Sequence, residues 1–199
     1  MSLLKQLQGV FTVKIGGIDR RLRFLSSTKP VWVTETDPDD KAATPEKPNP
    51  SSTQDNHVGY YFDLDTSERV ISDVIIRNKL LLAIGFTPNK DPCGPGGNSM
   101  FMEINAFTGG TAGGSLFDIT GDQLIDTHDL VNVNFNGKTE ALAPSGMEFL
   151  GNIQPPAILG LEGKDPYEKK YLSSSTGKIE LLHEIGHKLG VAYWMEIHY

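Results

Sequence analysis

The stretch VISDVIIRNKLLLAIGF, from Val70 to Phe86, decides the fold. Two runs rich in branched apolar residues, Val70–Ile76 and Leu80–Phe86, are separated by the polar residues Arg77-Asn78-Lys79. Residues of this type favour strands, and a short polar break between two such runs is typical of a β-hairpin. We therefore predict an antiparallel pair of strands with a tight turn at residues 77–79.

Strand signals continue upstream of this hairpin. The segment VFTVKIGGIDRRLRFL, residues 10–25, alternates apolar and polar residues on both sides of Gly16-Gly17, which predicts a second hairpin with a glycine turn. Tyr60–Leu64 is a further strand-like run. Between them, residues 36–57 are polar, with four prolines, and we interpret them as a surface loop or linker.

The downstream half gives the same kind of signal. Strands are expected in MFMEINAF (100–107), VNVNF (131–135) and QPPAILGL (154–161). A terminal strand is expected because Val191, Tyr193, Met195 and Ile197 alternate with other residues. One short helix is expected after the acidic segment near residue 129 and another near residues 178–188. The sequence thus predicts a mainly β, antiparallel fold with long loops.

Composition limits the function classes. The chain has 199 residues and a net charge of −7, which makes nucleic-acid binding an unfavourable interpretation. There is one cysteine, Cys93, so no disulfide forms within the chain. No apolar stretch has the length of a transmembrane helix, and the first residues lack a signal-peptide core, so an exported protein would contain this chain as a piece.

The acidic segment DITGDQLIDTHD, Asp118 to Asp129, is the most informative motif. Counted from Asp118, oxygen-bearing residues stand at positions 1, 3, 5, 9 and 12 of a twelve-residue loop, which is EF-hand spacing. Calcium prefers six to eight oxygen ligands, and position 7 supplies a backbone carbonyl. The predicted calcium ligands are therefore the following: Asp118, Thr120, Asp122, the Leu124 carbonyl and Asp126.

This loop departs from the EF-hand pattern. Thr120 is a weaker ligand than a carboxylate, and Gln123 stands at position 6, where the backbone adopts a positive φ and glycine is usual. Asp129 replaces the bidentate glutamate and is the least certain ligand, and the loop follows a strand-like segment rather than a helix. A solvated acidic turn is the alternative interpretation, because Asp and Gly are also turn formers.

A second motif, HEIGH at residues 183–187, has the spacing of a zinc protease. On a helix, His183 and His187 would bind zinc and Glu184 would act as the general base. Residue 193, where a third ligand is expected, is tyrosine, and Gly186 weakens the helix that the motif needs. We keep a zinc metalloprotease as the alternative function.

Several segments together resemble one family. They are the run from Gly59 to Gly110, SLFDITGDQLID, KKYLSSSTGKIE and YWMEIHY, which include the ERV-x-x-D and PN-x-DPC-x-x-GG-x-S patterns. In content and order they resemble the C-terminal domain of the PilC/PilY-type pilus-associated proteins of Gram-negative bacteria. The resemblance covers about residues 59–199, so we divide the chain into an N-terminal hairpin region, residues 1–58, and a β domain, residues 59–199.

The resemblance implies a fold and a role. The fold would be antiparallel sheets resembling part of a β-propeller. The role would be non-enzymatic: a calcium-binding module of an exported type IV pilus assembly or tip adhesion protein, peripheral to the outer membrane, with pilins and host or abiotic surfaces as partners. In this family the acidic loop is the calcium site and is associated with switching. An ion that only holds the loop in place is a further alternative.

Overall fold

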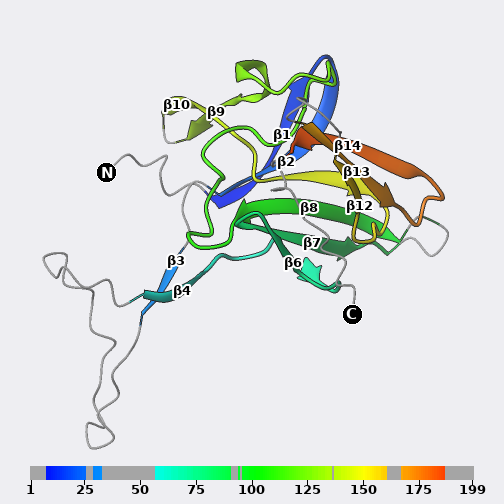
Figure 1. The fold of residues 1–199 in the computed structure, drawn as a ribbon, viewed down its shortest axis with the longest axis horizontal. Helices are drawn as coiled ribbons and strands as arrows, with labels where there is room; N and C mark the ends of the chain where they lie inside the picture. Colours follow the sequence, from blue (N-terminus) through cyan, green and yellow to red (C-terminus); the bar gives the residue numbers. More distant parts are fainter. Residues whose placement is uncertain are drawn as a thin grey trace, which may run out of the picture.

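The computed structural model describes residues 8–25, 29–32, 57–90, 94, 96–135, 137–160 and 167–186, and these residues form a mainly β fold (Figure 1). The strands that they form are β1 (Gln8–Ile15), β2 (Ile18–Leu25), β3 (Lys29–Trp32), β4 (His57–Tyr61), β5 (Arg69–Val70), β6 (Ile75–Arg77), β7 (Leu80–Pro88), β8 (Gly97–Asn105), β9 (Val131–Phe135), β10 (Lys138–Leu142), β11 (Gly146–Leu150), β12 (Ala157–Gly160), β13 (Tyr167–Ser173) and β14 (Ile179–Ile185). A short helix was expected after the acidic loop; the structure has instead a 3-10 helix, η2 (Thr127–Asp129), within the last three residues of the loop.

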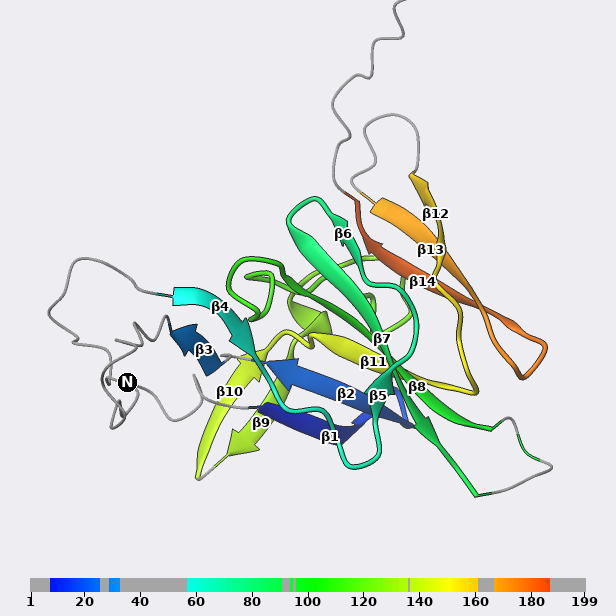
Figure 2. The same ribbon diagram turned by 90° about the horizontal axis from the view of Figure 1, so that it is seen from below.

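The largest sheet is antiparallel and has the order β1-β2-β11-β8-β7-β5, with β6 also paired to β7 (Figure 2). The N-terminal hairpin β1–β2 joins this sheet through β11. The remaining strands form the three-stranded sheet β12-β13-β14 and the pairs β9-β10 and β3-β4. Segments distant in sequence are therefore neighbours in one sheet.

The hairpin predicted from Val70–Phe86 is present around its turn. Arg77 pairs with Leu80, and the two residues between them, Asn78 and Lys79, have φ values of 51° and 67°. Two successive positive φ angles are typical of the hairpin turns whose twist matches the flanking strands. The upstream strand is shorter than predicted, since only its ends, β5 and β6, pair with β7. Residues 71–74 lie outside the ladder, with Ile71 and Val74 exposed.

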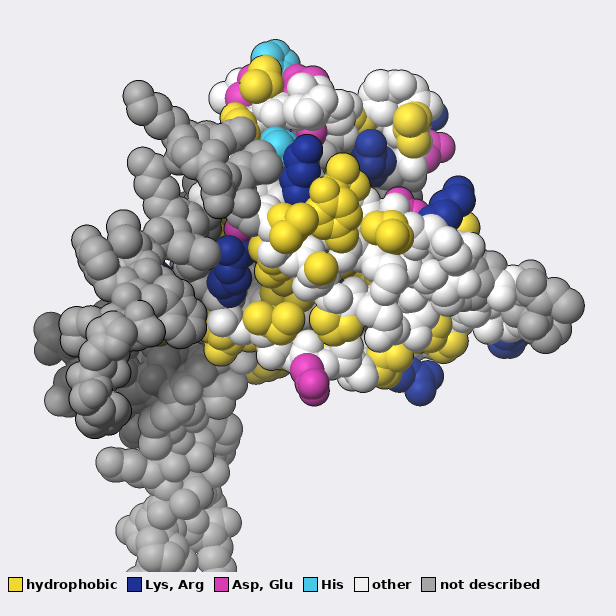
Figure 3. Space-filling model, turned by 45° about the vertical axis from the view of Figure 1, so that its right-hand side comes forward, with side chains coloured by type: hydrophobic (Ala, Val, Ile, Leu, Met, Phe, Trp, Pro, Cys, Tyr) yellow, Lys and Arg dark blue, Asp and Glu magenta, His cyan; other side chains and the backbone are white. Residues whose placement is uncertain are grey.

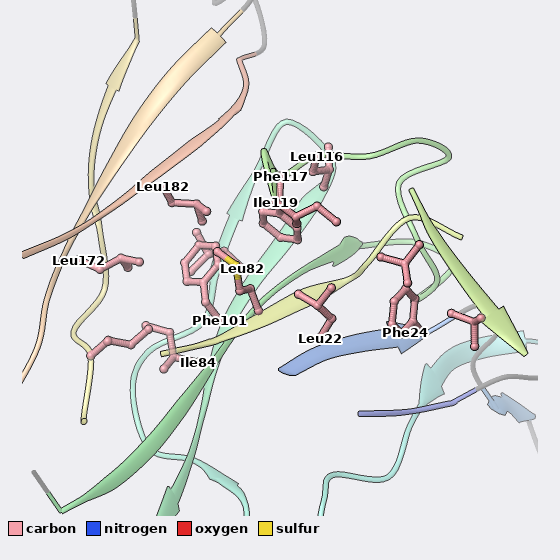
Figure 4. Close-up of a cluster of buried hydrophobic side chains, with 14 residues drawn as sticks. Leu22, Phe24, Leu82, Ile84, Phe101, Leu116, Phe117, Ile119, Leu172 and Leu182 are labelled. Carbon is pink, nitrogen blue, oxygen red and sulfur yellow. The ribbon is translucent and has the colours of Figure 1, made fainter. Parts of the chain in front are cut away.

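The main core lies on one face of the large sheet (Figure 4). Leu22 and Phe24 of β2 and Phe101 of β8 are buried there, with Leu172 and Leu182 of the three-stranded sheet packed opposite. The other face carries a smaller cluster in which Phe62 and Leu64 pack against Ala83, Met100 and Met102. The sheet is thus covered on both faces, which explains why β7 and β8 are apolar runs rather than alternating ones.

The helix predicted near residues 178–188 is wrong, because residues 179–185 form strand β14. Each of its residues pairs with one of β13, from Ser173↔Ile179 to Tyr167↔Ile185. Leu182 and Glu184 are buried while Ile179 and Leu181 are exposed, which is the period of a strand. Ile179, Leu182 and Ile185 suggested a helix by their spacing of three, but pairing with β13 places Leu182 on the opposite face of the strand from the other two.

The other predictions about architecture have mixed outcomes. The described residues form sheets of seven, two, three and two strands, so no four-stranded propeller blade is among them, and the propeller resemblance stays a prediction. The division at residue 58 is likewise untested. Tyr60–Leu64 is a strand only up to Tyr61. The terminal strand at 191–197, Cys93 and most of the polar loop at 36–57 lie outside the described residues.

Candidate metal-binding loop and its surroundings

The acidic loop begins directly beside β14. The backbones of Phe117 and Glu184 form an isolated antiparallel β-bridge, and the Asp118 backbone N–H donates to the His183 carbonyl at 3.1 Å. The Ile185 N–H donates to the Leu116 carbonyl at 3.2 Å. The first predicted ligand is therefore fixed by backbone hydrogen bonds to the three-stranded sheet.

The Asp118 side chain organises the first half of the loop. Its Oδ1 accepts from the Gly121 N–H at 2.5 Å and from the Thr120 hydroxyl at 3.3 Å, and its Oδ2 accepts from the Gln123 N–H at 2.8 Å. These bonds require a tight turn, and Gly121 and Gln123 have φ values of 83° and 67°. The positive φ that EF-hand spacing requires at position 6 is thus present, although the residue there is not glycine.

Three further predicted ligands are exposed. Thr120, Asp122 and Asp126 all lie on the surface of the loop. Asp122 accepts from the Leu124 N–H at 2.9 Å, and Asp126 accepts from the His128 N–H at 2.7 Å and from its ring nitrogen at 2.9 Å. The His128 N–H, followed by its ring, lowers the pKa of the Asp126 carboxyl. Asp126 also caps η2, so its carboxylate has a structural partner before any cation arrives.

Asp129, the least certain ligand, is the most buried carboxylate of the loop, at 1% exposed. Its Oδ1 accepts from the N–H groups of Ile119 at 2.9 Å and Thr120 at 3.2 Å, and its Oδ2 accepts from the Asp126 N–H at 3.1 Å. Burial raises the pKa of this carboxyl, and these N–H groups oppose the rise. Asp129 therefore joins the two ends of the loop through their backbone.

The donor set of the loop suits a hard cation, because it consists of carboxylate, hydroxyl and carbonyl oxygens. Each carboxylate oxygen that accepts one N–H retains a further lone pair. Leu124 is 53% exposed, while Ile125 is half-buried, as an anchoring residue would be. Among the described residues, however, no three His, Cys, Asp or Glu side chains are placed so that together they hold a metal ion. The ligand set therefore stays a prediction.

The HEIGH motif does not have the geometry of a zinc protease where it is described. In strand β14, successive side chains point to opposite faces, so His183 and Glu184 diverge. The Glu184 carboxylate accepts from Lys170, and among the described residues neither ring nitrogen of His183 has a hydrogen-bond partner. His187 lies outside the described residues. Without a helix, one turn cannot bring two histidines to a common metal.

A buried ionic cluster that the sequence analysis missed lies under β14. Lys170 of β13, 3% exposed in its side chain, donates to Glu103 of β8 and to Glu184, and lies 3.3 Å from Glu168. Arg77 donates to both oxygens of Glu168, at 2.7 and 2.6 Å. Burial alone lowers the pKa of Lys170, but Glu184 and Glu103 offset this, so that the pKa lies above its usual value. The cluster ties the two sheets together.

The ionic cluster had a sequence signal. Glu103 interrupts the apolar run MFMEINAF at a position that the strand buries. Three charged residues, Glu168, Lys169 and Lys170, directly precede Tyr171. A charge inside an apolar strand is expected to have a buried partner of opposite sign. The partner itself could not be named from the sequence, because it comes from another sheet.

A polar cavity of about 380 Å³ lies on the other face of the large sheet. Its lining includes the buried ion pair of Arg23 and Glu68 and the more exposed pair of Arg21 and Glu148. Burial raises the pKa of Glu148, and Arg21 opposes this. The charges that line this cavity are largely paired with one another.

Comparison with known proteins gives a consistent result. No family model matches the chain. The type IV pilus biogenesis factor PilY1 of Pseudomonas aeruginosa strain PAO1 is 26% identical over 110 residues, which is 53% of this chain and 9% of the relative. PilY1 of strain UCBPP-PA14 is 25% identical over 120 residues, or 56% of this chain and 9% of the relative. The chain thus spans less than a tenth of the length of these relatives.

The fold comparison agrees with the sequence comparison. The crystal structure of the P. aeruginosa PilY1 C-terminal domain superposes with a TM-score of 0.53 at 18% identity, covering 91% of this chain and 30% of that domain. The chain matches the PilY1 C-terminal domain. The resemblance to this domain seen in the sequence is therefore confirmed. These relatives are named as biogenesis factors rather than enzymes.

Proposed function

We propose that this chain is a calcium-binding module of a type IV pilus biogenesis or adhesion protein. The observation that carries the proposal is the PilY1 match, which is present in sequence and in fold. We place the module outside the cytoplasm, at the pilus or the outer-membrane surface, with pilins or contacted surfaces as partners. In the described part of the chain, no helix is long and apolar enough to span a membrane.

In this proposal the calcium ligands are the five predicted from spacing: Asp118, Thr120, Asp122, the Leu124 carbonyl and Asp126. The turn conformation at Gly121 and Gln123 supports the assignment, since it curves the loop as an EF-hand requires. The exposed carboxylates at positions 5 and 9 would move inward by side-chain rotation when the ion arrives. Asp129 would remain the anchor of the loop, because its oxygens already accept three backbone N–H groups.

The proposed effect of calcium is to order the loop and thereby to regulate pilus function or adhesion. Without the ion, the exposed carboxylates repel each other, and the loop is held by the hydrogen bonds that its own aspartates accept, chiefly those of Asp118 and Asp129. Because the Asp118 backbone N–H donates a hydrogen bond to the His183 carbonyl, ordering of the loop also affects strand β14. The same geometry fits an ion that only stabilises the fold. Measuring pilus function in cells that carry Asp122→Ala distinguishes a regulatory ion from a purely structural one.

The test is a thermal melt of chelator-treated protein with added calcium, magnesium or zinc. Calcium is expected to raise Tm in the unaltered chain and to have no effect on Asp122→Ala. Asp73→Ala, which removes an exposed carboxylate outside the loop, is the matched control and keeps the full response. Equal responses of Asp122→Ala and the unaltered chain would overturn the site assignment. A zinc response lost in His183→Ala would instead favour the metalloprotease alternative.

A further inference from the structure

Lys170 lies in surroundings that are unusual for a lysine. Its side chain is 3% exposed, and its ammonium lies 5.8 Å from the centroid of the Phe101 ring. Phe101, Leu172 and Leu182 belong to the core that lies between the two sheets (Figure 4). On the face of the molecule shown in Figure 3, by contrast, lysine and arginine side chains stand at the surface, apart from one another. A lysine that is removed from water in this way becomes a nucleophile whenever it is deprotonated.

Three carboxyl groups lie next to this amine. Lys170 Nζ contacts Glu103 Oε1 and Glu184 Oε2, and it lies 3.3 Å from Glu168 Oε1. Arg77 donates to both oxygens of Glu168, so that carboxylate has a cation of its own. Glu103 and Glu184, whose side chains are 4% and 1% exposed, share the Lys170 ammonium. Two buried carboxyl groups are thus held in contact with a single amine.

The Glu184 carboxyl favours its protonated form. Burial raises its pKa well above the usual value and Glu103 raises it further, while Lys170 opposes the rise. Its Oε1 is buried and has no hydrogen-bond partner in the described part of the chain. A neutral carboxylic acid has both a donor and an acceptor oxygen. Placed between an amine and a second carboxyl, it can give a proton to one group and take a proton from the other.

We propose that Lys170 and Glu103 condense to form an amide, so that a covalent bond joins β13 of the three-stranded sheet to β8 of the large sheet. The bond links Lys170 Nζ to Glu103 Cδ, across 67 positions of the chain. The ion pair described above is the arrangement in which the two groups meet before they react. Glu103 is the carboxyl that reacts, because Glu168 is held by Arg77 and Glu184 supplies the proton.

The reaction is a condensation in which nothing is oxidised or reduced. The Lys170 ammonium first passes a proton to the Glu103 carboxylate along their hydrogen bond, which leaves a neutral amine and a neutral acid. The amine nitrogen then attacks Glu103 Cδ, while Glu184 gives its proton to the departing hydroxyl and takes one from the nitrogen. The Cδ–O bond breaks and the oxygen leaves as water. Both protons of that water come from the ammonium, and Glu184 ends in its original state.

The position of the groups favours this reaction over hydrolysis of its product. Burial lowers the pKa of Lys170, but Glu184 and Glu103 outweigh this, so the neutral amine forms by transfer within the cluster rather than by loss of a proton to solvent. Groups that are held in contact react with effective concentrations of about 10⁵ M or more. The apolar core around the new amide excludes the water that would reverse the reaction.

The intact mass of the folded full chain, measured under denaturing conditions, tests the proposal. It is expected to be lower than the sequence mass by one water molecule, and a protease digest should contain a peptide pair joined through Lys170 and Glu103. A folded chain that has the full sequence mass overturns the proposal. Lys170→Arg should restore the full mass, because a guanidinium stays protonated. Lys169→Arg is the matched control: this lysine points to the opposite side of the strand, and its replacement should leave the loss of water unchanged.

Two carboxamide variants test the roles of the glutamates, and both keep the size of the side chain. In Glu103→Gln the loss of water should be replaced by a loss of ammonia, since the carboxamide nitrogen is then the leaving group. Glu184→Gln should form the bond about 100-fold more slowly after refolding, because it removes the acid that exchanges protons. Circular dichroism establishes that each variant is folded before its mass is measured. A loss of water that persists in Glu103→Gln would place the bond on another carboxyl and refute the assignment.

Discussion

Lys170 of β13 donates a hydrogen bond to Glu103 of β8, and this contact joins the three-stranded sheet to the large sheet. The Lys170 ammonium also lies 5.8 Å from the centroid of the Phe101 ring, in the middle of the core. The interface between the two sheets is therefore part hydrophobic and part ionic. Its ionic part makes the packing depend on charge state, and this gives the first two predictions.

Lys170→Met should destabilise the chain by about 3–5 kcal/mol, because it leaves buried carboxylates without their cation. Urea unfolding followed by circular dichroism measures the loss. Lys178→Met, which replaces an exposed lysine in the turn between β13 and β14, is the matched control and should change stability by less than about 0.5 kcal/mol. Similar losses in the two variants would mean that the cluster contributes little to stability.

Glu184 predicts a pH dependence. Burial raises the pKa of this carboxyl well above its usual value, Glu103 raises it further, and Lys170 opposes the rise. Since the pKa is higher in the folded state, the folded state binds the proton more tightly. The corresponding stability is present in full below the unfolded carboxyl's pKa and is lost as pH rises through the folded value. Glu184→Gln, which stays neutral, should flatten this decline in a series of urea titrations, and an unchanged slope would contradict the assignment.

Asp129→Ala should destabilise the acidic loop even in the absence of calcium. The substitution leaves the N–H groups of Ile119, Thr120 and Asp126 without their carboxylate partner, at a cost of about 2 kcal/mol or more. Hydrogen exchange at these three amides reports the effect locally. Asp122→Ala, whose carboxylate is exposed, should leave their exchange unchanged in calcium-free buffer. Equal exchange in the two variants would show that Asp129 does not anchor the loop.

Gly85→Ala should destabilise the opposite face of the large sheet. A Cβ at this position would collide with the Glu68 carboxylate, which forms the buried ion pair with Arg23. Moving that carboxylate costs about 1–3 kcal/mol. Gly114→Ala, where a Cβ meets no atom within 4 Å, is the control and should be nearly neutral in a thermal melt. A neutral Gly85→Ala would mean that Glu68 has an equally good position elsewhere.

Local sequence signals predicted the features that depend on neighbouring residues. The turns at Gly16-Gly17 and at residues 77–79 were identified from a glycine pair and from a short polar break between two apolar runs. Gly16, Gly17, Asn78 and Lys79 all have positive φ angles. The curvature of the acidic loop at Gln123 followed from spacing alone in the same way. In each case the deciding interaction spans only a few residues.

Features that depend on distant residues were not predictable in this way. Residues 179–185 fit a helix and a strand equally well by pattern, and β13 made them a strand. The role of Asp129 depends on the Ile119 and Thr120 amides, which approach it only after the loop closes. The partners of Lys170 lie on two other strands, so the sequence identified charged residues but not their pairing.

The placement of β2 beside β11 has a consequence for how the chain acquires its structure. Arg21 and Glu148, which face each other across this pairing, are 127 residues apart. Closing a loop of that length costs conformational entropy before any native contact stabilises the chain. Folding is therefore expected to be slow, as in other proteins dominated by non-local pairing. During synthesis, the edge of β2 that pairs with β11 therefore stays unpaired until the residues of β11 have emerged. A chaperone that shields this edge would be expected to raise the yield of folded protein.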